Sequence, residues 1–334
     1  MRQITGRFPS ANGKSRAAYR IDAPQEGPVR GVLQLSHGMC EYVGRYDALF
    51  SALCGAGWVA AGHDHIGHGA SAGSPEELGY FARRDGWQCL VEDVHTMTGL
   101  LREAYPGVPL VLLGHSMGSF IARETLRRYG DGYDGAIICG TAGPNPAAAL
   151  GIALASVDIA LRGGHHRSAL LQSLAFGGYN RRFEGRTPYD WLTRDNGIVD
   201  RYAADPFCTF IFTSSGFRDL FTLLRRVSRR DWAGSLPKKL PMLLIAGDMD
   251  PVGDYGRGVR RVYEGIRAAG CRDVSLKLYP GGRHEILNEL NRDEVYQDVL
   301  AFCRRLQKIW KDQVPPGNNH DGYHKSPAIT PGIY

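Results

Sequence analysis

A membrane-spanning helix needs about 20 consecutive apolar residues, and no apolar run in the sequence comes near that length. The N-terminal stretch, residues 1–16, is polar and has no apolar segment of the kind found in a secretory signal. The seven cysteines form no CxxC pair and their number is odd, so we expect reduced thiols. These absences predict a cytoplasmic location.

A concentrated charge of one sign is also missing. The net charge is +6 over 334 residues, and residues 144–232 contribute +4, from twelve Arg, no Lys and eight Asp or Glu. Nucleic-acid binders usually carry a denser basic stripe, so we expect no nucleic-acid partner. The excess of positive charge is compatible with binding to an anionic lipid surface or substrate. The simpler alternative is an arginine-rich surface exposed to solvent.

The chain does contain short apolar segments that alternate with amphipathic ones. Buried strands are predicted at 31–37, 57–63, 109–115, 135–140, 240–247 and 274–280. Helical patterns lie near 45–54, 86–104, 117–129, 257–268 and 292–310. This alternation predicts an α/β protein whose mostly parallel sheet has helices on both faces. The first thirty residues alternate polar and apolar side chains, which predicts an antiparallel hairpin at one edge.

The alternation stops at residue 141 and resumes near residue 240. We therefore expect a core in two parts, 1–143 and 236–311, with a helical cap inserted at 144–235. Ligands in open α/β sheets bind outside the carboxyl ends of the strands, so a cap there would shape the pocket. The end of the chain, 312–334, is rich in Pro, Gly and Asn, which predicts a poorly ordered tail.

A serine between two glycines follows one of the predicted strands, in LLGHSMGSF (112–120). The pattern Gly114-x-Ser116-x-Gly118, lodged between a strand and a helix, is typical of a nucleophile elbow. The strained turn lifts the serine hydroxyl above the sheet, and the glycines let strand and helix pass close together. Ser116 is therefore the candidate nucleophile.

A serine hydroxyl needs a base, and in this arrangement the acid and the base follow on loops after later strands. His284 lies four residues past the last predicted strand and is the predicted base. Three aspartates follow the preceding strand: Asp250 is preferred as the acid, Asp248 is the alternative, and Asp254 also lies close by.

The oxyanion formed by serine attack needs two backbone N–H donors. One should come from Met117, directly after the nucleophile, and the other from the loop SHGMCEYVGRY (36–46), where Met39 is the candidate. Glu41 in that loop is expected either to brace it or to be an exposed surface acid.

These segments resemble the monoglyceride lipase and lysophospholipase branch of the α/β-hydrolases, of the serine aminopeptidase S33 type. HGMCEYVGRY resembles the oxyanion loop of that branch, and HDHIGHGASAG resembles its D-x-x-GHG-x-S-x-G loop. LVEDVHTM, YPGVPLVLLGHSMG, GDMD and RHEILNE follow in the same order and spacing, so the similarity covers about 28–140 and 236–305.

The resemblance implies an α/β-hydrolase fold with an eight-stranded sheet, and no cofactor or metal. It also implies that Ser116, Asp250 and His284 form the catalytic triad, and that Met39 and Met117 supply the oxyanion hole. Two departures stand out: Ser119 replaces a second glycine that is common after GHSMG, and the cap has no clear match. Preferences for acyl-chain length and head group therefore do not carry over.

Several residues allow two interpretations. The apolar cap residues Leu150, Ile152, Leu154, Val157 and Ile159 either line an acyl pocket or form the cap's own core. HDHIGH (63–68) suggests a metal site, but its spacing fits no zinc signature, so a structural loop is favoured. His165 and His166 are expected at the surface or along the pocket, and His115 beside the nucleophile.

The sequence thus predicts a serine hydrolase that cleaves carboxylic esters of lipids, monoacylglycerols or lysophospholipids, through an acyl-enzyme. Its expected partners are a lipid-like acyl ester and, through transient contact of the cap, a membrane surface. The alternatives are an aminopeptidase or amidase on the same fold, a non-catalytic ligand receptor, or a metal-dependent hydrolase using HDHIGH.

Overall fold

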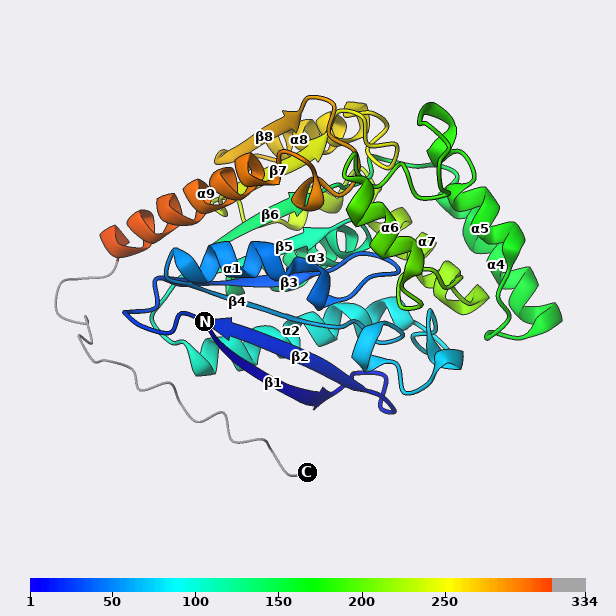
Figure 1. The fold of residues 1–334 in the computed structure, drawn as a ribbon, viewed down its shortest axis with the longest axis horizontal. Helices are drawn as coiled ribbons and strands as arrows, with labels where there is room; N and C mark the ends of the chain where they lie inside the picture. The colour runs from blue at the N-terminus through cyan, green and yellow to red at the C-terminus, as the bar shows by residue number, and fades with distance from the viewer. Residues whose placement is uncertain (314–334) are drawn as a thin grey trace.

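The computed structural model describes residues 1–313. Its centre is an eight-stranded sheet in the order β1-β2-β4-β3-β5-β6-β7-β8 (Figure 1). The hairpin of β1 (Arg2–Pro9) and β2 (Arg16–Ala23) forms one edge, and β2 pairs antiparallel with β4 (Trp58–His63). All other neighbouring strands of the sheet run parallel. The predicted fold class and the predicted edge hairpin are therefore confirmed.

The remaining elements follow the predicted alternation. The other strands are β3 (Gly31–Ser36), β5 (Leu110–His115), β6 (Gly135–Cys139), β7 (Met242–Gly247) and β8 (Val274–Tyr279). The core helices are α1 (Asp47–Gly55), α2 (Gly86–Ala104), α3 (Met117–Tyr129), α8 (Arg257–Ala268) and α9 (Arg292–Gln313). Short 3-10 turns lie at Val43–Tyr46, Gly69–Ser71, Pro75–Glu77, Gly130–Gly132, Tyr179–Arg182, Trp232–Ser235 and Ile286–Asn288.

The central strands β3 to β7 are buried on both faces of the sheet. Successive residues of a strand point to opposite faces. In β5, Leu110 and Leu112 pack into the cluster formed with α2, α3 and α8. Val111 and Leu113 pack into the cluster formed with α1 and α9. Figure 1 shows α1 and α9 on the near face of the sheet. The near-continuous apolar strands thus reflect a layer of helices on each side.

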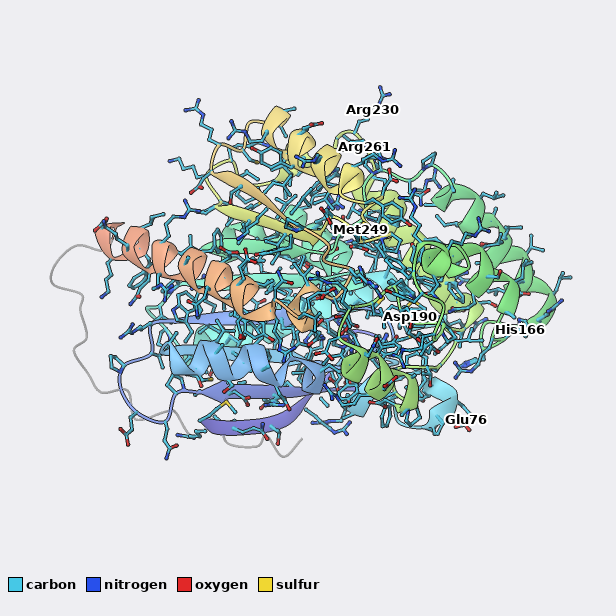
Figure 2. All side chains as sticks on the ribbon, turned by 45° about the horizontal axis from the view of Figure 1, so that its top comes forward. Glu76, His166, Asp190, Arg230, Met249 and Arg261 are labelled. Carbon is cyan, nitrogen blue, oxygen red and sulfur yellow. The ribbon has the colours of Figure 1, made fainter. Side chains whose placement is uncertain are left out.

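Four helices lie between β6 and β7 in the chain and gather beyond one end of the sheet (Figure 1). They are α4 (Ala148–Arg162), α5 (Ala169–Phe176), α6 (Asn196–Ala204) and α7 (Ser214–Val227). We call them the cap. Arg167, between α4 and α5, donates hydrogen bonds to the backbone carbonyls of Pro75 and Glu76, at 3.0 and 3.3 Å. Figure 2 shows Glu76 near the same edge of the cap as His166.

The domain limits at 143, 235 and 311 stay predictions, although α9 continues to Gln313. The predicted tail lies outside the described residues, except for 312 and 313. Among the described helices, none is both long enough and apolar enough to cross a bilayer.

Candidate active site

Ser116 occupies the sharp turn between β5 and α3. Its backbone has φ 53° and ψ −121°, a conformation that a residue with a side chain rarely adopts. A Cβ on Gly114 would meet the carbonyl oxygen of Gly118 at 2.4 Å, and one on Gly118 would meet that of Ser36 at 2.0 Å. The two glycines are therefore required by close backbone approach, as the elbow pattern predicts.

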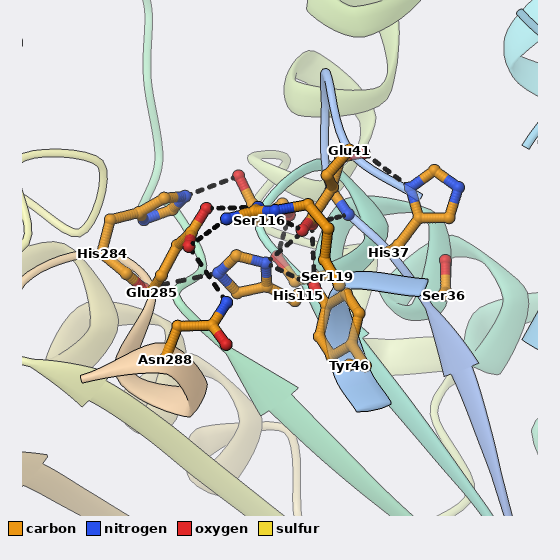
Figure 3. Close-up of polar contacts among 12 residues, drawn as sticks. Ser36, His37, Glu41, Tyr46, His115, Ser116, Ser119, His284, Glu285 and Asn288 are labelled. Atoms are coloured by element: carbon orange, nitrogen blue, oxygen red, sulfur yellow. Dashed lines mark hydrogen bonds and ion pairs between the residues drawn. The ribbon is translucent and has the colours of Figure 1, made fainter. Parts of the chain in front are cut away.

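The structure brings Ser116, His284 and Asp250 into one hydrogen-bonded row. Nε2 of His284 lies 2.8 Å from Oγ of Ser116, and its Nδ1 lies 3.0 Å from Oδ1 of Asp250. Figure 3 shows the contact between His284 and Ser116. Both His284 and Asp250 are buried. This spacing allows the imidazole to take a proton from the hydroxyl while the carboxylate orients its other nitrogen.

The other two aspartates have different partners. Oδ1 of Asp248 accepts a hydrogen bond from the backbone N–H of Gly281 at 2.7 Å, which ties together the two loops that carry Asp250 and His284. Asp254 pairs with Arg257 and Arg261. Asp250 is thus the aspartate that contacts His284, as preferred from the sequence.

A cavity of about 920 Å³ opens above Ser116. Met39 and Met117, the candidate oxyanion donors, line it beside Ser116 and His284. Met117 is the first residue of α3, where backbone N–H groups have no partner within the helix and favour negative charge. The opposite wall comes from the cap and includes Leu150, Leu154, Leu174, Leu220, Phe221 and Leu224.

Comparison with known proteins agrees with this geometry. The serine aminopeptidase S33 family matches residues 27–291. The chain belongs to this family. It is 32% identical to a monoacylglycerol lipase of Mycolicibacterium smegmatis, over 87% of this chain and 93% of the relative, and 30% identical to human monoglyceride lipase, over 87% and 88%.

A solved structure extends the comparison to three dimensions. A carboxyl esterase from Bacillus coagulans, crystallised with glycerol, superposes with a TM-score of 0.86 at 33% identity, covering 92% of this chain and 99% of that one. The predicted α/β-hydrolase fold and the predicted enzyme class, a carboxylic ester hydrolase, are confirmed.

In this S33-family chain, Glu41 is buried and braces the oxyanion loop. One of its oxygens accepts hydrogen bonds from the backbone N–H of Gly38, from the hydroxyl of Tyr46 at 2.8 Å and from Nδ1 of His115 at 3.0 Å. Although burial opposes ionisation, the charge and hydrogen bond of His115 hold the pKa of Glu41 well below its usual value. The exposed alternative for Glu41 is therefore wrong, and Figure 3 shows this network.

Arg45 connects this loop to the loop that carries the base. Its guanidinium contacts Glu41 at 3.1 Å and Glu285, next to His284, at 2.7 and 2.8 Å. Sequence reasoning assigned no role to Arg45, Tyr46 or Glu285. The sequence did mark these positions, because all three residues lie within the RY and RHE portions of the motifs that carry the family resemblance.

The histidines of HDHIGH are buried and serve the structure of the loop. Burial lowers the pKa of both His63 and His68 to about 3, so both stay neutral near pH 7. Asp64 accepts hydrogen bonds from the backbone N–H groups of Val43 and Ala70, at 2.9 and 2.8 Å. Within residues 1–313, no three His, Cys, Asp or Glu side chains are arranged to hold a metal ion.

Of the apolar residues of α4, two fit the pocket interpretation and one fits neither interpretation. Leu150 and Leu154 line the cavity, whereas Val157 is 57% exposed and belongs to neither the cavity wall nor a cap core. His165 stacks on Tyr80 of the core with ring centres 3.8 Å apart. Nδ1 of His166 lies 2.7 Å from Asp158. These two histidines therefore join segments rather than line the pocket.

Ser119, the departure from the common glycine, is buried beneath the nucleophile. Its hydroxyl donates to the carbonyl of Ser116 at 2.5 Å and lies 2.8 Å from the hydroxyl of Thr141, from which it can accept. The extra hydroxyl thus has two hydrogen-bond partners, so the elbow keeps its geometry.

Proposed function

We propose that the protein hydrolyses the ester bond of long-chain monoacylglycerols, with lysophospholipids as the second candidate substrate. The observation that carries this proposal is the Ser116–His284–Asp250 row beneath a cavity with an apolar cap wall. A hydrophobic wall on one side of a polar reaction centre suits an acyl chain joined to an ester. The two lipases to which the chain is similar point the same way.

In the proposed reaction, Oγ of Ser116 attacks the ester carbonyl while Nε2 of His284 takes the hydroxyl proton. Asp250 holds the imidazole by its other nitrogen and stabilises its positive charge. The backbone N–H groups of Met39 and Met117 then meet the negative oxygen of the tetrahedral intermediate. His284 returns the proton to the departing alcohol, and water activated by the same histidine releases the fatty acid.

The charges along the cavity favour a neutral head group. Among the described residues that line it, Arg261 is the only one with a fixed positive charge, and it is paired with Asp254 at 3.2 Å. Glu41 and Glu285 add negative charge at the inner end. A phosphate would therefore meet no unpaired cation there, so we favour the glycerol ester over the lysophospholipid.

We further propose that the cap touches a membrane surface transiently. Large apolar side chains of α4 and α5 are exposed: Leu150, Val157, Leu161, Leu170 and Leu174, by 57 to 77%. Leu150 and Leu174 also line the cavity, so the exposed patch is continuous with the pocket. Contiguous exposed apolar surface of this kind suits contact with lipid, and exposed Arg162 beside it suits anionic head groups.

The seven cysteines are free, which supports the predicted cytoplasmic location.

The test combines labelling with a substrate series. Ser116→Ala should abolish labelling by a fluorophosphonate probe and lower kcat by roughly 10⁶-fold, because the nucleophile is lost. The unaltered enzyme should then prefer long-chain monoacylglycerols to matched lysophospholipids and to aminoacyl anilides. Persistent labelling of the variant would refute the nucleophile, and faster cleavage of anilides than of esters would favour the aminopeptidase alternative.

A further inference from the structure

Arg123, on the helix that follows the nucleophile, is a buried cation that the reaction does not use. Only 1% of its surface is exposed, and its Nε has no hydrogen-bond partner. Within residues 1–313, no carboxylate forms an ion pair with it. Burial lowers the pKa of Arg123 to about 9, so it remains charged near pH 7. A buried charge without an opposite charge is costly and calls for a structural reason.

The partners of Arg123 lie at the two ends of the cap: two backbone carbonyls and the hydroxyl of Thr141, to which it donates at 3.3 Å. One terminal nitrogen donates to the carbonyl of Ala142 at 3.1 Å, just where the chain leaves β6 for the cap. The other donates to the carbonyl of Val227, the last residue of α7, just where the chain leaves the cap. These two points are 85 residues apart in the sequence (227 − 142).

The two ends of the cap also lie beside each other directly. The backbone N–H of Asn145 donates to Oγ of Ser228 at 3.2 Å. Trp232, on the returning segment, lies against the guanidinium of Arg123, 4.1 Å from its centre to the ring centre. A guanidinium suits this place because its fork reaches two acceptors and its flat face stacks on an aromatic ring.

We propose that Arg123 is a positioning residue that fixes both ends of the cap to helix α3, and so sets the height of the cap over Ser116. Positive charge at the last carbonyls of α7 is also favourable to that helix. An acyl chain long enough to touch the cap depends on this setting, whereas a short ester needs only the core residues around Ser116. The inference requires ester hydrolysis but not any particular natural lipid.

The test compares Arg123→Met, Arg123→Lys and the control Arg229→Met, which removes an exposed arginine close to the returning segment. Each variant is assayed with p-nitrophenyl laurate and with p-nitrophenyl acetate. We expect Arg123→Met to lower the laurate-to-acetate ratio of kcat/KM by about tenfold or more, since a small misplacement of a binding wall is costly. Arg123→Lys should recover part of the loss, and the control should stay within about twofold of the unaltered enzyme.

Amide hydrogen exchange distinguishes positioning from general stability. We expect faster exchange at 141–145 and 227–232 in Arg123→Met, with β5 and α9 unchanged. An unchanged ester ratio in a folded variant, or equal loss on both esters with uniformly faster exchange, would overturn the proposal. If Arg123→Met does not fold, the laurate-to-acetate ratio of kcat/KM of Arg123→Lys is the test. A ratio equal to that of the unaltered enzyme refutes the role, and a lowered ratio supports it. Failure of the monoacylglycerol proposal would leave these readouts unaffected.

Discussion

The catalytic centre and the cap of this protein differ in how their residues are held. Around Ser116, polar side chains are buried and linked: Glu41 alone accepts hydrogen bonds from four groups, and one of them, Arg45, joins two loops. In α4 and α5, by contrast, few residues are buried and large leucines face outward. The centre is therefore fixed by directional bonds, whereas α4 and α5 turn apolar side chains to the solvent and to the cavity.

This difference matters because the two regions do different work on an ester. Bond cleavage needs atoms placed within a few tenths of an ångström, which buried hydrogen-bond networks provide. Enclosing an acyl chain needs apolar area but little directionality. Substitutions in the centre should therefore affect all substrates, and substitutions on the cap should affect only those that reach it.

After the loss of Ser116 itself, the largest expected effect separates two aspartates of the centre. Asp250→Asn should lower kcat by about 10⁴-fold on short and long esters alike, because the carboxylate that orients and stabilises the imidazole is lost. Asp248→Asn, two residues earlier, is the matched control and should lower kcat by less than about tenfold, since Asp248 only accepts a backbone hydrogen bond. Steady-state kinetics on both esters measure the effects, and a larger loss in Asp248→Asn would reassign the acid.

A smaller effect concerns the contact between the cap and the core at Asp219. This side chain of α7 lies against the backbone N–H groups of Gly86 and Trp87, at the start of α2, with Arg218 and Asp85 as the nearest charges. Burial raises the pKa of Asp219 to about 7. The folded state therefore holds the proton more tightly than the unfolded state, and the stability this provides is lost as the pH rises from about 4 through 7.

The corresponding measurement is the free energy of unfolding of Asp219→Asn against pH. An amide has no charge to bury, so the variant should gain roughly 2 to 3 kcal/mol relative to the unaltered protein between pH 5 and pH 8. Asp231→Asn, at an exposed position, should show no such gain. A constant difference between the Asp219 variant and the unaltered protein across this range would contradict the raised pKa.

The smallest effect tests the outer surface of the cap. Leu161→Gln alters a side chain that is 77% exposed and does not line the cavity. We expect hydrolysis of monoacylglycerol presented in anionic vesicles to fall about three- to tenfold, since one leucine contributes about 2 kcal/mol at most on leaving water. Hydrolysis of p-nitrophenyl acetate should not change.

Leu290→Gln, at a 63% exposed position outside the cap, is the control for that substitution. It should leave both reactions unchanged, and vesicle co-sedimentation should weaken only for the cap variant. Equal rates on vesicles for Leu161→Gln and the unaltered enzyme would show that this surface does not meet lipid.

The sequence was most informative where short-range geometry dominates. The elbow around Ser116 could be predicted because two glycines, one strand end and one helix start lie within a few residues. The acid was ambiguous since Asp248, Asp250 and Asp254 share one loop, and only the 3.0 Å contact to His284 separates them. Local pattern was thus sufficient for Ser116 and His284, but it left the acid open among three aspartates.

Beyond the row of Ser116, His284 and Asp250, contacts between distant segments could not be predicted. Arg45 and Glu285 are 240 residues apart, and nothing in the sequence near either one specifies the other. The apolar residues of α4 were ambiguous for a related reason. Helical periodicity identifies an apolar face but not its neighbour, and α4 packs chiefly against α7 while other leucines remain exposed.

The adjacency of Asn145 and Ser228 has a consequence for how such enzymes can diversify. The chain leaves the sheet and returns to it at nearly the same point, so the cap is one continuous insertion whose two ends lie together. A different stretch, longer or shorter, could be spliced between these positions while the sheet and its reactive serine keep their geometry. New ester preferences could then arise by exchange of one contiguous piece of the gene.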